Sequence, residues 1–144
     1  MDVPASLLSD TARLPARAHD DDAAFDLYAD EAIELAPGER AAVGTGVALA
    51  LAEGSCGLVL PRSGLATRHG ITVLNAPGLI DPGYRGEVKV VLLNTDPTET
   101  FAIEPGDRIA QLLVLSPGPV ALTLAAEGLG ETARGTAGFG STGR

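Results

Sequence analysis

Short runs in which hydrophobic residues alternate with small or polar residues recur along the chain, and they predict β-strands. Valine and leucine alternate with alanine over residues 47–51, and hydrophobic residues occupy alternate positions around Lys89 over residues 88–92. Alternation with a period of two places every second side chain on one face of a strand. Further β-rich runs follow at residues 71–74, 101–103, 109–115 and 120–124.

Pro-Gly or Glu-Gly pairs separate these runs and predict tight turns. They stand at positions 37–38, 53–54, 77–78, 82–83, 105–106 and 117–118. Many short strands with frequent turn signals are typical of an all-β sandwich or barrel. We therefore expect an all-β domain whose helix content is one or two turns near residues 64–68.

Length and charge narrow the class of protein. The chain has 144 residues, which fits one domain. Its formal net charge of −9 argues against nucleic-acid binding, because neutralised phosphates dominate that affinity. The one cysteine, Cys56, excludes an internal disulfide and a cysteine-based zinc site. No signal peptide and no apolar stretch of about 18 residues are visible, so we expect no membrane partner and a cytoplasmic location.

The last residues, 128–144 (GLGETARGTAGFGSTGR), differ in composition from the rest of the chain. They are rich in glycine and small polar residues, which bury too little surface to fold alone. Either this segment is a frayed tail, or it orders over a ligand, with glycine amides near phosphates and Phe139 over an aromatic ring. We accordingly expect a barrel domain over residues 1–127 and a flexible C-terminal segment over residues 128–144.

The segment PRSGLATRHG (61–70) carries groups suited to an anion. Arg62 offers a rigid fork of donors, Ser63 adds a hydroxyl, and Gly64 allows close backbone approach. Amides that open a short helix would point at the same anion. The alternative is a strand that ends in a polar turn.

The segment NAPGLIDPGYRGEVKV (75–90) places a carboxylate beside an aromatic ring. Asp81 opens the turn signal Asp-Pro-Gly, so it is either a turn carboxylate that binds its own backbone or a base that orients and deprotonates a water. Two more polar residues lie in apolar surroundings, Asp26 in AAFDLYAD (23–30) and Gln111 in GDRIAQLLV (106–114). A carboxylate with apolar neighbours needs a pairing group or a nearby cation, whereas Gln111 is either an edge amide or a ligand-binding group.

These segments, in this order, resemble the five motifs of the trimeric deoxyuridine triphosphatase (dUTPase) family. AAFDLYAD looks like the first, PRSGLA the second, NAPGLIDPGYRGE the third, GDRIAQLL the fourth and RGTAGFGSTG the fifth. The resemblance runs from about Pro15 to Thr142. It implies a jelly-roll-like β-barrel or sandwich and the hydrolysis of dUTP to dUMP and pyrophosphate. That reaction keeps uracil out of DNA and supplies dUMP for thymidylate synthesis.

The resemblance also implies a role for each matched residue. Asp81 would activate the water that attacks the α-phosphorus, Asn75 and the hairpin backbone would read the uracil edge, and Tyr84 would lie under the deoxyribose. The substrate-binding set that it implies is Arg62, Ser63, Gly64, Asn75, Gly78, Ile80, Tyr84, Lys89, Gln111, Arg134, Phe139, Gly140, Ser141 and Thr142. The cofactor would be Mg²⁺, held mostly by substrate phosphates, with Asp26 acting through water.

In such enzymes three identical chains share their active sites, and the tail of one chain covers a pocket built by others. Two departures from the family pattern stand out, Thr136-Ala137 in the fifth motif and Ala24 in the first. Ala137 carries a Cβ where glycine is usual, so a positive φ there would be strained. Two other functions stay open, a dCTP deaminase on the same fold and a non-catalytic nucleotide-binding module with the tail as a switch.

Overall fold

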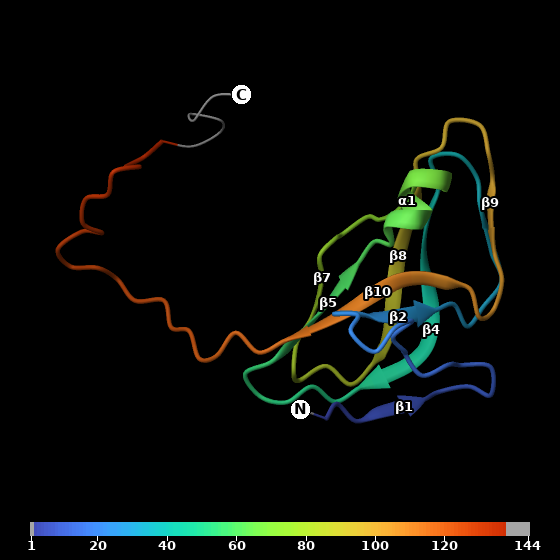
Figure 1. Cartoon of the computed structure of the whole chain (residues 1–144), viewed down its shortest axis with the longest axis horizontal. Coiled ribbons are helices and arrows are strands. Elements are labelled where there is room, and N and C mark those ends of the chain that lie inside the picture. Colours follow the sequence, from blue (N-terminus) through green and yellow to red (C-terminus); the bar gives the residue numbers. More distant parts are fainter. Residues whose placement is uncertain (1, 138–144) are drawn as a thin grey trace.

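The computed structural model describes residues 2–137, and this part of the chain folds as short antiparallel strands with one short helix (Figure 1). The elements in chain order are β1 (Ala5–Leu7), β2 (Phe25–Tyr28), β3 (Ile33–Leu35), β4 (Arg40–Leu49), β5 (Cys56–Leu60), α1 (Ser63–His69), β6 (Ile71–Val73), β7 (Gly78–Ile80), β8 (Glu87–Asn94), β9 (Phe101–Ile103) and β10 (Arg108–Leu115). The predicted all-β domain is therefore confirmed.

The strands form two four-stranded sheets, in the orders β1-β4-β8-β6 and β2-β10-β5-β7, and a two-stranded pair of β3 with β9. The seven strand pairings within residues 2–137 are all antiparallel. In the second sheet β5 lies between β10 and β7, with Gln111 opposite Leu60 and Gly78 opposite Val59. This arrangement brings the second, third and fourth motif segments onto one sheet.

Aliphatic side chains from both sheets make the core, as the scarcity of aromatic residues requires. The largest side chains with almost no exposed surface are Leu27, Leu35, Ile71, Leu92, Ile103, Ile109, Val43, Val47 and Val90. Burial of one such side chain stabilises the fold by about 1.5–3 kcal/mol. Asn94 is also fully buried, and its amide donates to the carbonyls of Leu35 and Glu99.

The helix α1 lies where the sequence places it, after β5. Arg62 precedes it in extended conformation (φ −91°, ψ 126°), and Gly70 ends it in the left-handed region at φ 63°. The amide of Gly70 donates to the carbonyls of Ala66 and Leu65, which closes the last turn. Glycine is favoured at this position because it adopts a positive φ without steric cost.

The predicted strands around residues 47–51, 71–74, 88–92, 101–103 and 109–115 overlap β4, β6, β8, β9 and β10. The prediction for residues 120–124 is wrong: this segment is in none of the strands that the structure describes. It follows β10 and extends away from the barrel, without a neighbouring strand to pair with (Figure 1). Within residues 2–137, no helix has the length and apolar character that a membrane crossing requires.

Candidate active site

A pocket of about 270 Å³ lies at the hairpin that joins β7 to β8. Its lining residues are Val59, Asn75, Gly78, Leu79, Ile80, Asp81, Tyr84, Glu87, Val88 and Lys89. Six residues that the sequence analysis assigned to the site, Asn75, Gly78, Ile80, Asp81, Tyr84 and Lys89, therefore line one cavity. The third motif builds this cavity almost alone, with Val59 of β5 as its neighbour.

The turn that carries Asp81 is held by its own backbone and by Arg85. The amide of Tyr84 donates to the carbonyl of Asp81 at 3.1 Å. Arg85 Nη1 donates to the carbonyls of Pro82 and Tyr84 at 2.6 and 2.8 Å. Asp81 itself is exposed at the pocket edge, where its carboxylate meets solvent. The Asp81 carboxylate is therefore exposed to solvent on a turn whose backbone is held by hydrogen bonds.

The side chain of Asn75 is positioned by Gly78, and that of Tyr84 by a hydrogen bond to the backbone. A Cβ built at Gly78 would lie 3.3 Å from Nδ2 of Asn75, so the amide side chain lies directly over that glycine. The hydroxyl of Tyr84 donates to the carbonyl of Glu87 at 2.8 Å, and the residue is 47% exposed. An amide at one end of the pocket and an aromatic face beside it can bind a base and its sugar.

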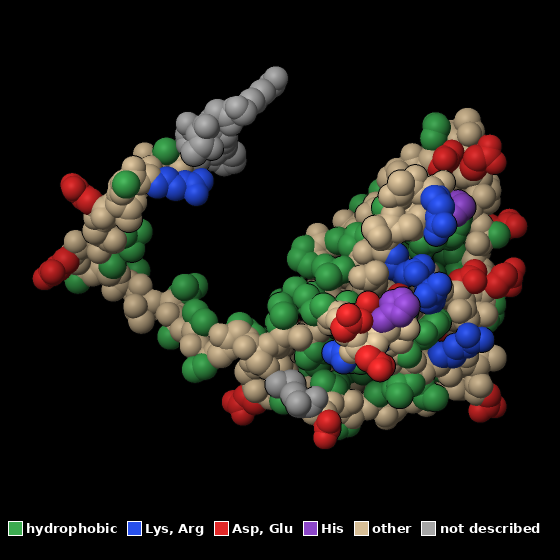
Figure 2. Space-filling model, viewed as in Figure 1, with side chains coloured by type: hydrophobic (Ala, Val, Ile, Leu, Met, Phe, Trp, Pro, Cys, Tyr) green, Lys and Arg blue, Asp and Glu red, His purple; other side chains and the backbone are tan. Residues whose placement is uncertain are grey.

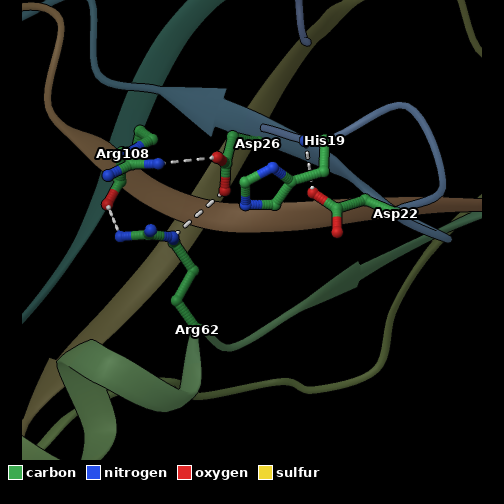
Figure 3. Close-up of polar contacts among 5 residues, drawn as sticks. All are labelled: His19, Asp22, Asp26, Arg62 and Arg108. Carbon is green, nitrogen blue, oxygen red and sulfur yellow. Dashed lines mark hydrogen bonds and ion pairs between the residues drawn. The ribbon is translucent and has the colours of Figure 1, made fainter. Parts of the chain in front are cut away.

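A second cluster joins the first, second and fourth motif segments through Asp26 (Figure 3). Arg62 Nε donates to Oδ1 of Asp26 at 3.1 Å, and Arg108 Nη1 donates to Oδ2 at 3.3 Å. Arg62 Nη1 also donates to the carbonyl of Arg108 at 3.0 Å. Asp26 is 8% exposed, so the cation that the sequence analysis required beside it is present twice.

Ser63, Gly64 and Gln111 surround this cluster in the chain and in the sheet. Ser63 and Gly64 begin α1 directly after Arg62. Gln111 lies opposite Asp26 in the register of β10 with β2, so their side chains leave the same face of the sheet. Two guanidinium groups share one carboxylate here, which leaves an excess positive charge. Figure 2 shows Lys and Arg side chains, in blue, on this face of the barrel. This face suits an anion even though the whole chain is acidic.

The pocket and the cluster lie along the same strand, β5. Val59, which lines the pocket and pairs with Gly78, is one residue from the end of that strand, and Arg62 follows the end. Extended chain from Val59 to Arg62 corresponds to roughly 10 Å. None of Asp26, Arg62 and Arg108 is among the residues that line the pocket.

Arg134, the C-terminal residue of the predicted site that the structure describes, contacts neither the pocket nor the Asp26 cluster in any described interaction. Arg134 is exposed, and its Nε donates to the carbonyl of Ala137 at 3.1 Å within the tail. The tail extends away from the barrel in Figure 1. Phe139, Gly140, Ser141 and Thr142 lie outside the described residues.

The sequence also matches a family model described as dUTPase, over residues 10–143. The chain belongs to the dUTPase family. Its curated relatives include the deoxyuridine 5'-triphosphate nucleotidohydrolases of Mycobacterium bovis (strain BCG / Pasteur 1173P2) and Mycobacterium leprae (strain TN), which are 55% and 53% identical over 134 residues. In both cases the match covers 90% of this chain and 87% of the relative.

Solved dUTPase structures share the fold. The dUTPase of Staphylococcus bacteriophage 80alpha with dUpNHpp superposes with a TM-score of 0.91 and 30% identity, over 99% of each chain. A mutant dUTPase of the S. aureus phage phi11, a structure described for the coordination of its structural Mg(II) ion, superposes with a TM-score of 0.81 and 28% identity. That match covers 88% of this chain and 98% of the phage chain. The jelly-roll-like sandwich expected of the dUTPase family is thus confirmed.

Divalent metal use in the dUTPase family raises the question of which residues here fit a metal ion. Among residues 2–137, no group of three or more His, Cys, Asp or Glu side chains is placed to hold one. Both oxygens of Asp26 already accept hydrogen bonds from arginines. The described residues therefore form no protein cage for a metal ion.

Two residues of this dUTPase site were missed by the sequence analysis, Arg85 and Arg108. Arg85 was visible beside Tyr84, but its role depends on a side chain that folds back onto its own turn. Arg108 lies 82 residues from Asp26, and the pairing of β10 with β2 brings them together. The one available signal was the need of Asp26 for a cation, which does not say which arginine supplies it.

Proposed function

We propose that this chain is a dUTP diphosphatase that hydrolyses dUTP to dUMP and pyrophosphate. The activity keeps uracil out of DNA and supplies dUMP for thymidylate synthesis. The observation that carries the proposal is the gathering of Asn75, Asp81 and Tyr84 around one pocket in a chain that belongs to the dUTPase family. Curated relatives at 53–55% identity are deoxyuridine triphosphate nucleotidohydrolases, which supports the same substrate.

The pocket selects uracil because another base would leave polar groups of the pocket without hydrogen-bond partners. The Watson–Crick edge of uracil presents an acceptor, a donor and an acceptor, which the amide of Asn75 and the backbone near Gly78 and Ile80 complement. Cytosine presents the wrong group at two of those three positions. A buried polar site rejects a ligand that leaves its groups unpaired, often by several orders of magnitude.

Asp81 is the general base of the proposed reaction. Its carboxylate orients a water and accepts a proton as the water oxygen bonds to the α-phosphorus. The bond from that phosphorus to the bridging oxygen breaks, and pyrophosphate leaves with the electron pair. Exposure of Asp81 at the pocket edge leaves room for the water.

Positioning of the phosphates is assigned to Arg62, Ser63, Gly64 and Gln111, with Lys89 at the pocket. Asp26 would hold an Mg²⁺ ion through water, with most of its ligands from the phosphates, and the ion would supply neutralising charge. Placement and charge neutralisation account for most of phosphoryl-transfer catalysis. The ion pair with Asp26 supports this assignment because it orients the Arg62 guanidinium before substrate arrives.

The active unit is a cytoplasmic homotrimer in which different copies contribute to one site. Among the described residues, none of Asp26, Arg62 and Arg108 lines the pocket, which supports a site completed by another copy. The segment that follows β10 also supports assembly with another copy. Its residues Val120, Leu122 and Leu124 are 79%, 99% and 102% exposed, so one chain leaves an alternating apolar row uncovered. A second copy of this chain is the partner proposed for that row.

Residues 128–144 form the lid of the proposed site. Arg134, Ser141 and Thr142 would bind the γ-phosphate, with Gly140 allowing close backbone approach and Phe139 stacking on the uracil. Closure of such a segment expels water from the phosphates. The division of the chain after residue 127 is part of this proposal, and the last strand of the barrel, β10, ends earlier, at Leu115.

A substrate panel tests the function directly. Purified full-length protein with Mg²⁺ is given dUTP, dCTP, UTP or dTTP, and nucleotide and pyrophosphate products are separated. Turnover of dUTP alone supports the proposal, ammonia release from dCTP would indicate a deaminase, and tight binding of dUTP without product would indicate a non-catalytic module. In ¹⁸O-labelled water the label should enter dUMP, because the water attacks the α-phosphorus.

A further inference from the structure

The ring of Tyr84 lies directly against the backbone of Gly86. A Cβ built at Gly86 would lie 2.5 Å from the Tyr84 hydroxyl oxygen, 2.7 Å from Cζ and 3.0 Å from Cε2. Real Cβ atoms essentially never approach other heavy atoms so closely. Residue 86 can therefore carry no side chain while the ring keeps this position.

Backbone conformation does not require glycine at this position. The φ of Gly86 lies outside the left-handed region that disfavours side chains, and the three atoms nearest to the built Cβ all belong to Tyr84. The backbone at residue 86 would thus accept alanine. The steric clash would instead fall on the half-exposed side chain of Tyr84. The ring would move, because its far end is the easiest part of the contact to displace.

A movement of the ring would change the pocket. Tyr84 lines the 270 Å³ cavity, whereas Gly86 is not among its lining residues. The hydroxyl bond to the carbonyl of Glu87 holds the ring against Gly86. A Cβ at position 86 would break this bond and displace the ring from its place in the pocket wall.

We propose that Gly86 is a positioning residue for nucleotide selection: its missing side chain lets the Tyr84 ring lie flat on the hairpin and sets the width of the pocket. The inference rests on the proposed function, since it assigns Gly86 to selection of the same substrate. Gly86 acts only through Tyr84, the residue that the proposed function places under the sugar.

The test compares Gly86→Ala with Gly83→Ala in full-length protein. No atom lies within 4 Å of a Cβ built at Gly83, so this neighbouring substitution in the same turn is a matched control. For Gly86→Ala we expect the KM for dUTP to rise roughly tenfold, as for a single-methylene misfit, with kcat changed less than about threefold. In a Tyr84→Ala background the same substitution should have no effect on KM. Equal effects of the two glycine substitutions, or an undiminished effect without the ring, would overturn the proposal.

A second measurement does not depend on catalysis. The chain has two tyrosines and no tryptophan, so in a Tyr28→Phe background the ultraviolet emission reports Tyr84 alone. Gly86→Ala should change the intensity of that emission because the phenol loses its carbonyl partner, whereas Gly83→Ala should not. If wild-type protein fails to hydrolyse dUTP, the proposed function fails while this signal still decides the ring position. An unchanged signal in Gly86→Ala would show that the ring does not depend on residue 86.

Discussion

Asp26 and Arg62 lie 36 residues apart in the chain and meet through a bond of 3.1 Å between Oδ1 and Nε. The carboxylate is almost buried, and the side chain of Arg62 is only 20% exposed. Nε and Nη1 of Arg62 are used for this bond and for the carbonyl of Arg108, which fixes the plane of the guanidinium. The remaining donors of the guanidinium are then held in a fixed orientation before an anion binds.

Replacement of Asp26 by asparagine should destabilise the protein and weaken nucleotide binding together. Asp26→Asn leaves Arg62 and Arg108 without a counter-charge, and the loss of charge-assisted bonds of this kind costs about 1–3 kcal/mol. Urea unfolding measures the stability, and titration with dUMP and with pyrophosphate separates the two halves of the site. Pyrophosphate binding should weaken more than dUMP binding.

The matched control is Asp22→Asn, because Asp22 accepts a bond from the amide of His19 in an exposed loop close to the same cluster (Figure 3). It should change neither stability nor pyrophosphate affinity by more than a small factor. Equal losses in both variants would mean that general loss of negative charge, rather than orientation of Arg62, explains the effect.

The apolar row of the tail should determine the state of assembly. Leu122→Asp combined with Leu124→Asp places charges on side chains that are fully exposed in one chain, so the fold of the barrel should be unaffected. If a second copy covers this row, the charges would be buried on assembly, and the trimer should dissociate. Light scattering after size-exclusion chromatography measures the mass; Glu127→Gln, elsewhere in the exposed tail, is the control. A trimer that survives the double substitution would place the interface elsewhere.

Acid sensitivity should depend in part on Asp96. Backbone amides of Thr98 and Glu99 donate to its carboxylate and hold the pKa of Asp96 below its ordinary value. A lowered pKa in the folded state means that the ionised group stabilises the fold above the unfolded-state pKa, and that this stabilisation is lost as the pH falls through the folded-state value. Asp96→Asn should therefore have a lower urea midpoint than wild type at neutral pH.

That difference in midpoint should shrink as the pH is lowered through the acidic range where aspartate protonates, about pH 4 and below. Asp21→Asn, in an exposed turn, serves as the comparison and should show no such convergence. A gap between wild type and Asp96→Asn that is constant from neutral to acidic pH would rule out this account of the carboxylate.

Elements with a repeated local pattern could be predicted from the sequence, and elements defined by distant partners could not. Period-two alternation along residues 88–92 is enough to find β8, because one of its faces is buried in the core. Three-residue strands such as β1 and β3 are too short to show a period. Residues 120–124 show the same alternation as a strand but have no strand to pair with in the described part of this chain, so the pattern alone was misleading.

The site divides in the same way. Asn75, Asp81 and Tyr84 were assigned to the site through the resemblance of their segment to the third dUTPase motif. They lie in one continuous segment, and the hairpin brings them around one pocket. The contact of Asp26 with Arg108 spans 82 residues and depends on strand register, which a single sequence does not specify. The role of Gly86 depends on the rotamer of one tyrosine, so no spacing rule could have found it.

The most direct test of the account is a comparison of wild type with Asp81→Asn in dUTP binding and in pyrophosphate release. Asparagine keeps the shape of the side chain but cannot accept the proton of the attacking water. We expect dUTP affinity within a few-fold of wild type and pyrophosphate release slowed by about 10²–10⁴-fold, the usual contribution of a general base. Pyrophosphate release by Asp81→Asn at a rate close to wild type would contradict the account, because the water would then be activated by another group.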